Sequence, residues 1–221
     1  MTGARPVIAI DGPAGVGKST LARRLAQELG LPYLNTGLMY RAVTLAATRA
    51  GVDPEDGAAL AALARTTTFD LDATVRPPEL LIDGAAPDPA LASPDVESTV
   101  SRVARHPEVR TVLRTEQRRL AAGGGVVEGR DIGTVVAPDA DVKIFLRAAE
   151  DERVARRRSE REAPGQDVAR ALAARDALDA TTNPLVPAEN AVAIDTSRMG
   201  ADEVFDHALA IVRARLGERA G

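Results

Sequence analysis

The chain has 221 residues, enough for one α/β domain with a small insertion but short for two independent domains. Its net charge is −4 and only 2% of its residues are aromatic, which argues against a protein that coats nucleic acid or stacks bases. No cysteine is present, so disulfides and thiolate metal sites are excluded, and we expect a reducing, cytoplasmic location. The first apolar run, residues 7–10, is too short for a signal peptide or membrane span, so we expect no membrane partner.

Short apolar strands alternate with amphipathic helices along the chain, which predicts a parallel sheet with helical crossovers. Strands are expected at residues 7–10, 33–34, 126–128, 142–146 and 191–195. Helices are expected at residues 19–29, 36–50 and 201–216, and the first and last of them have apolar residues on one face. The predicted fold class is therefore α/β, a P-loop type parallel sheet flanked by helices.

Two stretches interrupt this alternation. Residues 66–92 hold TTTFDLDA and ELLIDG around a Pro-Pro pair, a hairpin-like pattern that predicts a small antiparallel insert. Ser93 and Pro94 then favour the start of a helix, as its N-cap and first residue. Residues 147–190 carry a dense Arg/Glu run, which fits a helical lid at about 150–180 or a pair of solvated helices. We expect one domain over residues 1–221.

A phosphate-binding loop is the strongest motif of the chain. Residues 12–19 read GPAGVGKS and match G-x-x-x-x-G-K-[ST] between a β-branched strand and a helix. Backbone N–H groups of such a loop hold phosphate, the lysine reaches the β- and γ-phosphates, and the Ser/Thr hydroxyl ligates Mg²⁺. The alternative is a glycine-rich turn without a ligand. We expect Lys18 to be catalytic, Ser19 to ligate Mg²⁺, and ATP to bind Gly12, Pro13, Ala14, Gly15, Val16, Gly17, Lys18, Ser19 and Thr20.

The sequence also separates kinases from switch GTPases. An N-K-x-D guanine-binding motif is absent, because Lys143 is the only other lysine and follows Val142. No Asp is followed by Gly three residues later, as a GTPase switch requires. A small-molecule kinase needs positive charge around its acceptor, because two anions must approach to bonding distance.

The segment NTGLMYR, residues 35–41, is a first candidate for the acceptor site. Thr36 is expected to cap a helix whose N-terminus attracts phosphate, with Tyr40 and Arg41 one turn inside. A plain capped helix with Met39 in the core fits the same pattern.

The segment EGRD, residues 128–131, is a second candidate, at the carboxyl end of a buried strand where ligands of open α/β sheets bind. Arg130 and Asp131 would hold phosphate and a base or ribose there, or form a structural ion pair. Residues 101–110 are weaker evidence, because His106 before proline fits a turn residue. We expect His207 on the exposed side of the last helix.

With these segments in place, the sequence resembles the bacterial cytidylate kinase family along nearly its whole length. The matching segments are IDGPAGVGKST (10–20), NTGLMYR (35–41), SRVARHPEVR (101–110), EGRDIGTVVAPDADVKIFL (128–146), RDALD (175–179) and PLVPA (184–188). The resemblance implies transfer of the γ-phosphate of ATP, with Mg²⁺, to CMP or dCMP. It also implies a core, a lid, a three-stranded monophosphate-binding insert and a monomer.

The resemblance further implies roles for single residues. The segment that holds the monophosphate is matched by Thr36, Tyr40 and Arg41, and Arg130 matches a phosphate-contacting arginine that we expect to be catalytic. The positions that read cytosine are matched by Ser101, Arg110 and Asp131. The lid-edge arginine and the sugar-contacting aspartate are matched by Arg175 and Asp179. A carboxylate at 131 would accept from the cytosine amine and disfavour uracil, which has a carbonyl there.

One stretch departs from the family pattern. Many members have D-S-x-R-x-x-x-P-L after the lid, whereas residues 179–185 read DATTNPL, two residues shorter and without that arginine. One phosphate contact of the family therefore has no matching residue in this stretch, and another arginine would have to supply it.

The lid region holds five crowded arginines, of which Arg153, Arg157 and Arg161 are spaced by four and share a helix face. Most are expected to pair with nearby acidic residues on a surface helix. By resemblance Arg156 is the one expected to reach ATP and act in catalysis. Two further functions stay open: a P-loop kinase for AMP, UMP or shikimate, and a nucleotide sensor without catalysis.

Overall fold

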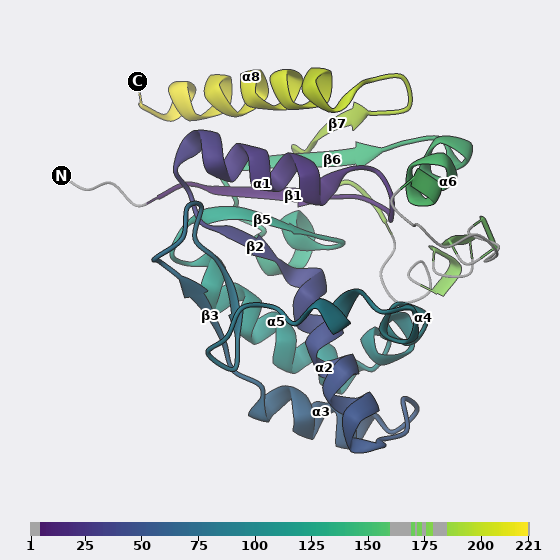
Figure 1. The fold of residues 1–221 in the computed structure, drawn as a ribbon. Helices are drawn as coiled ribbons and strands as arrows, with labels where there is room; N and C mark the ends of the chain where they lie inside the picture. The colour runs from purple at the N-terminus through teal and green to yellow at the C-terminus, as the bar shows by residue number, and fades with distance from the viewer. Residues whose placement is uncertain (1–4, 160–168, 171, 174–175, 179–184, 221) are drawn as a thin grey trace.

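The computed structural model describes residues 5–159, 169–170, 172–173, 176–178 and 185–220, with backbone alone at 218–220. Within these residues five strands form one parallel sheet in the order β2-β5-β1-β6-β7 (Figure 1). The strands are β1 (Val7–Asp11), β2 (Tyr33–Asn35), β5 (Gly125–Gly129), β6 (Val142–Arg147) and β7 (Val192–Asp195). Each lies within about one residue of its apolar run, and the predicted α/β fold class is confirmed.

Helices cover both faces of this sheet, because side chains alternate along each strand. On β1, Ile8 and Ile10 face one core and Ala9 faces the other. The first core is closed by α1 (Lys18–Leu29) and α8 (Ala201–Ala220). The second is closed by α2 (Thr36–Ala50), α3 (Gly57–Thr66) and α5 (Pro107–Ala121), which lie together below the sheet in Figure 1. Burying each Leu or Ile contributes about 1.5–3 kcal/mol, so the two cores fix the strand ends that carry the polar residues.

The antiparallel insert is a hairpin of β3 (Phe69–Asp72) and β4 (Glu79–Ile82). The third strand implied by the resemblance is not found in the described residues. After Ile82 the chain turns at Asp83, whose φ is +51°, and makes a single bridge before a proline-rich stretch that lacks ladder donors. The amide of Tyr33 on β2 donates to the carbonyl of Pro78 at 2.8 Å, so the hairpin is attached to the edge of the main sheet.

Short elements connect these layers around the cleft described below. They are η1 (Pro89–Ala92), α4 (Pro94–Ala104), the π-helical turn η2 (Ile132–Val136) and α6 (Glu150–Ser159). Ser93 caps α4 as predicted, accepting from the amide of Val96 at 3.4 Å, with Pro94 as the first helical residue. The predicted lid extends from α6 into residues outside the described part. No helix in the described ranges has the length and apolar character needed to cross a membrane.

Candidate active site

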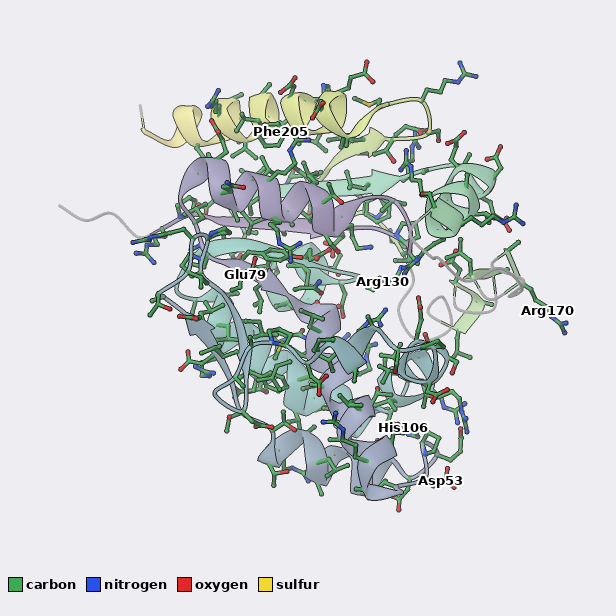
Figure 2. All side chains as sticks on the ribbon, in the orientation of Figure 1. Asp53, Glu79, His106, Arg130, Arg170 and Phe205 are labelled. Carbon is green, nitrogen blue, oxygen red and sulfur yellow. The ribbon has the colours of Figure 1, made fainter. Side chains whose placement is uncertain are left out.

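The carboxyl ends of β2 and β5 and the P-loop that follows β1 line one cleft of about 570 Å³. The P-loop forms one wall, and α2 and α4 form the other. Figure 2 shows Arg130 between the sheet and the helices below it. The cleft brings together these sequence-predicted residues: Ala14, Gly15, Gly17, Lys18, Ser19, Thr20, Thr36, Tyr40, Arg41, Ser101, Arg110, Arg130 and Asp131.

The P-loop has the strand–loop–helix context that its sequence predicted. Gly12 has φ +149°, and a Cβ there would lie 2.3 Å from the carbonyl oxygen of Leu146, so only glycine fits between β1 and β6. Gly17 immediately precedes α1 and has φ +92°. The Lys18 ammonium donates to the carbonyl of Pro13 at 2.6 Å, which places a positive charge over the loop at the helix N-terminus.

A buried carboxylate that the sequence reasoning did not single out lies beside the P-loop. Glu128, near the end of β5, is 2% exposed and accepts from the Ser19 hydroxyl at 3.1 Å and from the Tyr33 hydroxyl at 2.5 Å. Burial, followed by the nearby Glu128 charge, raises the pKa of Tyr33 far above its usual range, so its hydroxyl stays a donor. The clue was present in the sequence, since Glu128 directly precedes Gly129-Arg130-Asp131 at a strand end.

This pair of oxygen ligands fits a magnesium ion. Mg²⁺ prefers oxygen donors and is usually held by one or two protein groups together with substrate phosphates and water. The Ser19 hydroxyl and the Glu128 carboxylate already lie within 3.1 Å of each other at the mouth of the P-loop. The chemistry of this donor set therefore suits Mg²⁺ bound with a nucleotide.

The acceptor helix α2 begins differently from the prediction. Its N-cap is Asn35, whose side chain accepts from the amide of Leu38 at 3.3 Å, so the expectation that Thr36 is the cap was wrong. The extended backbone of Asn35 suits a cap, whereas Thr36 is already helical and donates to the carbonyl of Glu128 at 2.7 Å. Thr36 thus ties the acceptor helix to β5. Met39 is fully buried in the core, as the alternative reading had it.

Tyr40 and Arg41 lie one turn inside α2 and both line the cleft, as predicted. Burial raises the pKa of Tyr40 to about 12, with the Arg110 charge acting in the opposite direction. The Arg41 guanidinium donates to the carbonyl of Leu91 at 2.8 Å, and its other terminal nitrogen lies 3.9 Å from Glu97. Residues of α2, η1 and α4 are thereby linked at the acceptor side of the cleft.

Asp131 is both a cleft residue and a member of an ion-pair cluster. Its Oδ2 accepts from Arg110 at 3.2 Å and from Arg114 at 2.5 Å, and Asp131 and Arg110 are each 9% exposed. The sequence reasoning missed Arg114, although it follows Arg110 by one helical turn on α5 and was detectable from that spacing. The two arginines fix the carboxylate, and Ser101 lines the same cleft from α4.

The turn after β5 is held to the P-loop by a second buried carboxylate. Asp11, the last residue of β1, accepts from the amides of Ile132 and Gly133, both at 2.7 Å. Burial raises the pKa of Asp11, while these two amides act to lower it. Arg130, just before this turn, donates to the carbonyl of Gly12 at 3.2 Å. These hydrogen bonds therefore connect the P-loop side of the cleft with the segment that follows β5.

Arg153 and Arg157 of α6 have described partners on other segments, whereas their spacing predicted pairs with nearby acidic residues on a surface helix. Arg153 is 9% exposed, donates to the carbonyl of Ala14 at 3.3 Å and pairs with Asp176. Arg157 lines the cleft and pairs with Glu97 at 3.2 Å. Both pairs join α6 to other parts of the chain, since one face of this helix packs over the P-loop rather than facing solvent.

Arg156 takes a different position from Arg157. Its guanidinium donates to the hydroxyl of Thr196 at 3.0 Å and to the carbonyl of Thr196 at 2.5 Å, and it is absent from the described cleft lining. The Thr196 hydroxyl in turn lies 3.3 Å from the carbonyl of Val16. Arg156 is therefore linked to the P-loop through Thr196, on the side of the loop away from the cleft. Arg161, Arg175 and Asp179 lie outside the described residues.

The two histidines are not part of the cleft. The Nε2 atom of His106 lies 2.9 Å from the carbonyl of Pro54, and Figure 2 shows His106 near Asp53, far below Arg130. His207 is exposed on α8, as expected. The chemistry of the cleft therefore rests on lysine, arginine and carboxylate side chains.

Comparison with known proteins adds to this geometry. A family model described as "Cytidylate kinase" matches residues 8–214. The chain is 48% identical to a cytidylate kinase of Pelotomaculum thermopropionicum, covering 95% of this chain and 96% of that protein. It is 44% identical to a cytidylate kinase of Geobacillus kaustophilus, with coverages of 95% and 97%.

Among solved structures, an uncharacterized protein from Eubacterium ventriosum shares the fold alone, with a TM-score of 0.51 and 13% identity over 95% of this chain and 99% of that one. The full-length sequence similarity and the family match lead to the same assignment. This chain belongs to the cytidylate kinase family.

Proposed function

We propose that this chain is an ATP-dependent CMP and dCMP kinase, which yields ADP with CDP or dCDP. The observation that carries the proposal is a single cleft in which a P-loop faces an acceptor pocket of arginines and one carboxylate, in a chain of the cytidylate kinase family. The P-loop fits the donor phosphates, and the pocket fits an anionic nucleotide with a polar base.

On the donor side, backbone amides of residues 12–19 and the N-terminus of α1 would hold the ATP phosphates. The Lys18 ammonium would exchange the carbonyl of Pro13 for the β- and γ-phosphate oxygens, a short movement of a flexible side chain. A phosphate oxygen of CMP attacks the γ-phosphorus in line, and the bond to the β-phosphate oxygen of ATP breaks. No general base is needed, because the attacking oxygen is already anionic.

Mg²⁺ bound with ATP would supply charge neutralisation at the transferring group. We propose Ser19 as a direct ligand and Glu128 as the carboxylate that holds the ion or its water. Tyr33 orients Glu128, since its hydroxyl donates to Oε1 while Ser19 donates to Oε2.

On the acceptor side, Arg41 and Arg130 would bind the CMP phosphate from two directions. Arg130 lies next to the P-loop through the carbonyl of Gly12, so it would contact both the acceptor and the transferring phosphoryl group. Thr36 and Tyr40 shape the same wall of the cleft. Catalysis would thus consist of positioning and electrostatic stabilisation, as expected for phosphoryl transfer.

The base would be read by Asp131 with Arg110 and Ser101. Both arginine contacts of Asp131 use Oδ2, so we propose Oδ1 as the acceptor for the exocyclic amine of cytosine. Arg110 and Ser101 would donate to N3 and O2 of the base. Uracil presents a carbonyl opposite the carboxylate, and the resulting repulsion would disfavour UMP.

Three lid residues complete the proposed site. Arg156 would leave Thr196 and reach ATP when the lid closes, which would also exclude water and limit ATP hydrolysis. Arg175 would contact phosphate at the lid edge, and Asp179 the sugar. We further propose that the protein acts as a cytoplasmic monomer on small nucleotides, without nucleic acid or membrane partners.

A coupled assay of ADP release tests the proposal, with Mg-ATP and a panel of acceptors: CMP, dCMP, UMP, AMP and shikimate. We expect turnover with CMP and dCMP well above the rest. Faster turnover of AMP or shikimate would assign a different acceptor to the same cleft, and ATP binding without turnover of any acceptor would indicate a nucleotide sensor.

A further inference from the structure

Glu97 is one of the carboxylates that line the cleft. It lies one turn before Ser101 on α4, and its side chain is 17% exposed. A single oxygen, Oε1, lies 3.2 Å from Arg157 on α6 and 3.9 Å from Arg41 on α2. One carboxylate oxygen therefore contacts arginines from both sides of the cleft.

The other carboxylates that line the cleft have different partners. Asp131 binds Arg110 and Arg114, and Glu128 binds Ser19 and Tyr33. Asp88 caps η1 and pairs with the exposed Arg49. Glu97 differs from them because Arg41, which we have proposed to bind the acceptor phosphate, is among its ion-pair partners, as is Arg157 of the same cleft.

Oε1 of Glu97 is a negatively charged oxygen that lies between two guanidinium groups, at 3.2 Å from Arg157 and 3.9 Å from Arg41. A phosphate bound between α2 and the lid helix would accept from the same two guanidinium groups. We infer that Glu97 occupies this position in the nucleotide-free protein and competes with the CMP phosphate for Arg41 and Arg157. This inference rests on the proposed function, because it assigns Arg41 to the acceptor phosphate.

Two consequences follow from this competition. Binding of CMP must first separate Glu97 from Arg41, so the affinity for the monophosphate is lower than the arginines alone would give. The pair of Glu97 and Arg157 also connects α4 with α6, so it holds the acceptor wall and the lid helix together before the substrate arrives. Glu97 is thus a residue that sets acceptor affinity, without contacting the reacting atoms.

The test compares Glu97→Gln with Asp95→Asn. Both variants remove one negative charge from the first turn of α4, but Asp95 is exposed and does not line the cleft. Calorimetric titration should show that Glu97→Gln binds CMP roughly two- to five-fold more tightly, the range expected for a partly exposed ion pair. Asp95→Asn should match the unaltered chain, and Glu97→Asp, which keeps the charge, should bind CMP less tightly than Glu97→Gln.

Cytidine provides the second measurement, because it has the base and sugar but no phosphate. Its inhibition constant should be the same for Glu97→Gln and the unaltered chain. A change in cytidine affinity equal to that for CMP would overturn the inference and place Glu97 at the sugar or base. Weaker CMP binding by Glu97→Gln would overturn it as well, since Glu97 would then support the phosphate site.

A double variant tests whether Glu97 and the CMP phosphate compete for Arg41 in particular. In an Arg41→Gln background, Glu97→Gln should give a smaller gain in CMP affinity than it does alone, and an undiminished gain would contradict a shared contact. Turnover of CMP by the unaltered chain is measured alongside. Without turnover both the proposed function and the role of Glu97 fail, whereas turnover with unchanged CMP affinity in Glu97→Gln removes the role of Glu97 alone.

Discussion

Ser19, in the first turn of α1, donates a hydrogen bond of 3.1 Å to Glu128, the buried carboxylate near the end of β5. The two residues are far apart in sequence and meet because β1 and β5 are parallel neighbours. Tyr33 holds the other oxygen of the carboxylate at 2.5 Å. A hydroxyl and a carboxylate are thereby oriented toward the place where the ATP phosphates would lie.

Glu128→Gln tests this relationship. The amide keeps the shape of the side chain but removes the charge that would attract Mg²⁺, so the Mg²⁺ concentration for half-maximal activity should rise about ten-fold or more. Titration of activity with Mg²⁺, together with calorimetric binding of Mg-ATP, measures the effect. Glu108→Gln, an exposed change on α5, is the control. An unchanged Mg²⁺ requirement in Glu128→Gln would contradict the proposed role.

The central features of the donor site were predictable from local sequence. The P-loop is a contiguous motif whose glycines adopt backbone conformations that other residues rarely take, as Gly17 with a φ of +92° shows. The strands were predictable because buried parallel strands are short apolar runs.

The remaining features depend on contacts between distant segments. Glu128 and Arg114 became site residues only when the sheet order and the packing of α5 brought them to the cleft. The N-cap of α2 was assigned to Thr36 because Thr and Asn both cap well, and only the backbone geometry of Asn35 separates them. The α6 arginines were expected at the surface because helical spacing does not show which face a neighbour covers.

Asp131→Ala tests the reading of cytosine. The change removes the acceptor for the base amine and leaves Arg110 and Arg114 without their shared carboxylate. We expect kcat/KM for CMP to fall roughly 10²-fold or more, with little change in the affinity for ATP. Steady-state kinetics with CMP and direct ATP binding measure the two effects. Equal losses for both nucleotides would refute a role in reading the base.

The arginines of α6 allow a comparison of neighbouring residues. Arg156→Ala should lower kcat roughly 10²-fold, because the proposed contact with ATP acts on the transferring phosphoryl group. Arg157→Ala should mainly change the KM for CMP, since Arg157 pairs with Glu97 at the acceptor wall. Arg158→Ala, at an exposed position, serves as the control for both. A normal kcat for Arg156→Ala would contradict the proposed contact between Arg156 and ATP, and another residue would then have to make it.

Tyr40 should make the protein sensitive to alkaline pH. Its pKa is raised from 10.0 to about 12 in the folded chain, chiefly by burial. The unfolded chain loses this proton near pH 10 while the folded chain keeps it, so the contribution to stability is complete below pH 10 and is lost between about pH 10 and 12. Denaturant unfolding across this range should show a fall in the free energy of unfolding that is about 2–3 kcal/mol smaller in Tyr40→Phe than in the unaltered chain. An identical fall in both proteins would contradict this account.

Lys18→Ala tests the P-loop itself. The ammonium over the loop would no longer neutralise the β- and γ-phosphates, so kcat should fall roughly 10²- to 10³-fold or more. Lys18 belongs to neither hydrophobic core, and we therefore expect circular dichroism and thermal unfolding to stay close to those of the unaltered chain. If Lys18→Ala lost its folded structure as well as its activity, the loss of activity would be explained by unfolding, and the catalytic role of Lys18 would have no support.

The central claim is that the two walls of the cleft bind ATP and CMP for direct transfer between them. Incubation with γ-³²P-labelled ATP, Mg²⁺ and CMP, followed by chromatography of the nucleotides, tests it most directly. The account predicts that the label moves to CDP, that dCMP gives labelled dCDP, and that Lys18→Ala yields neither above background. Label released only as inorganic phosphate, or transferred to UMP or AMP in preference to CMP, would contradict it.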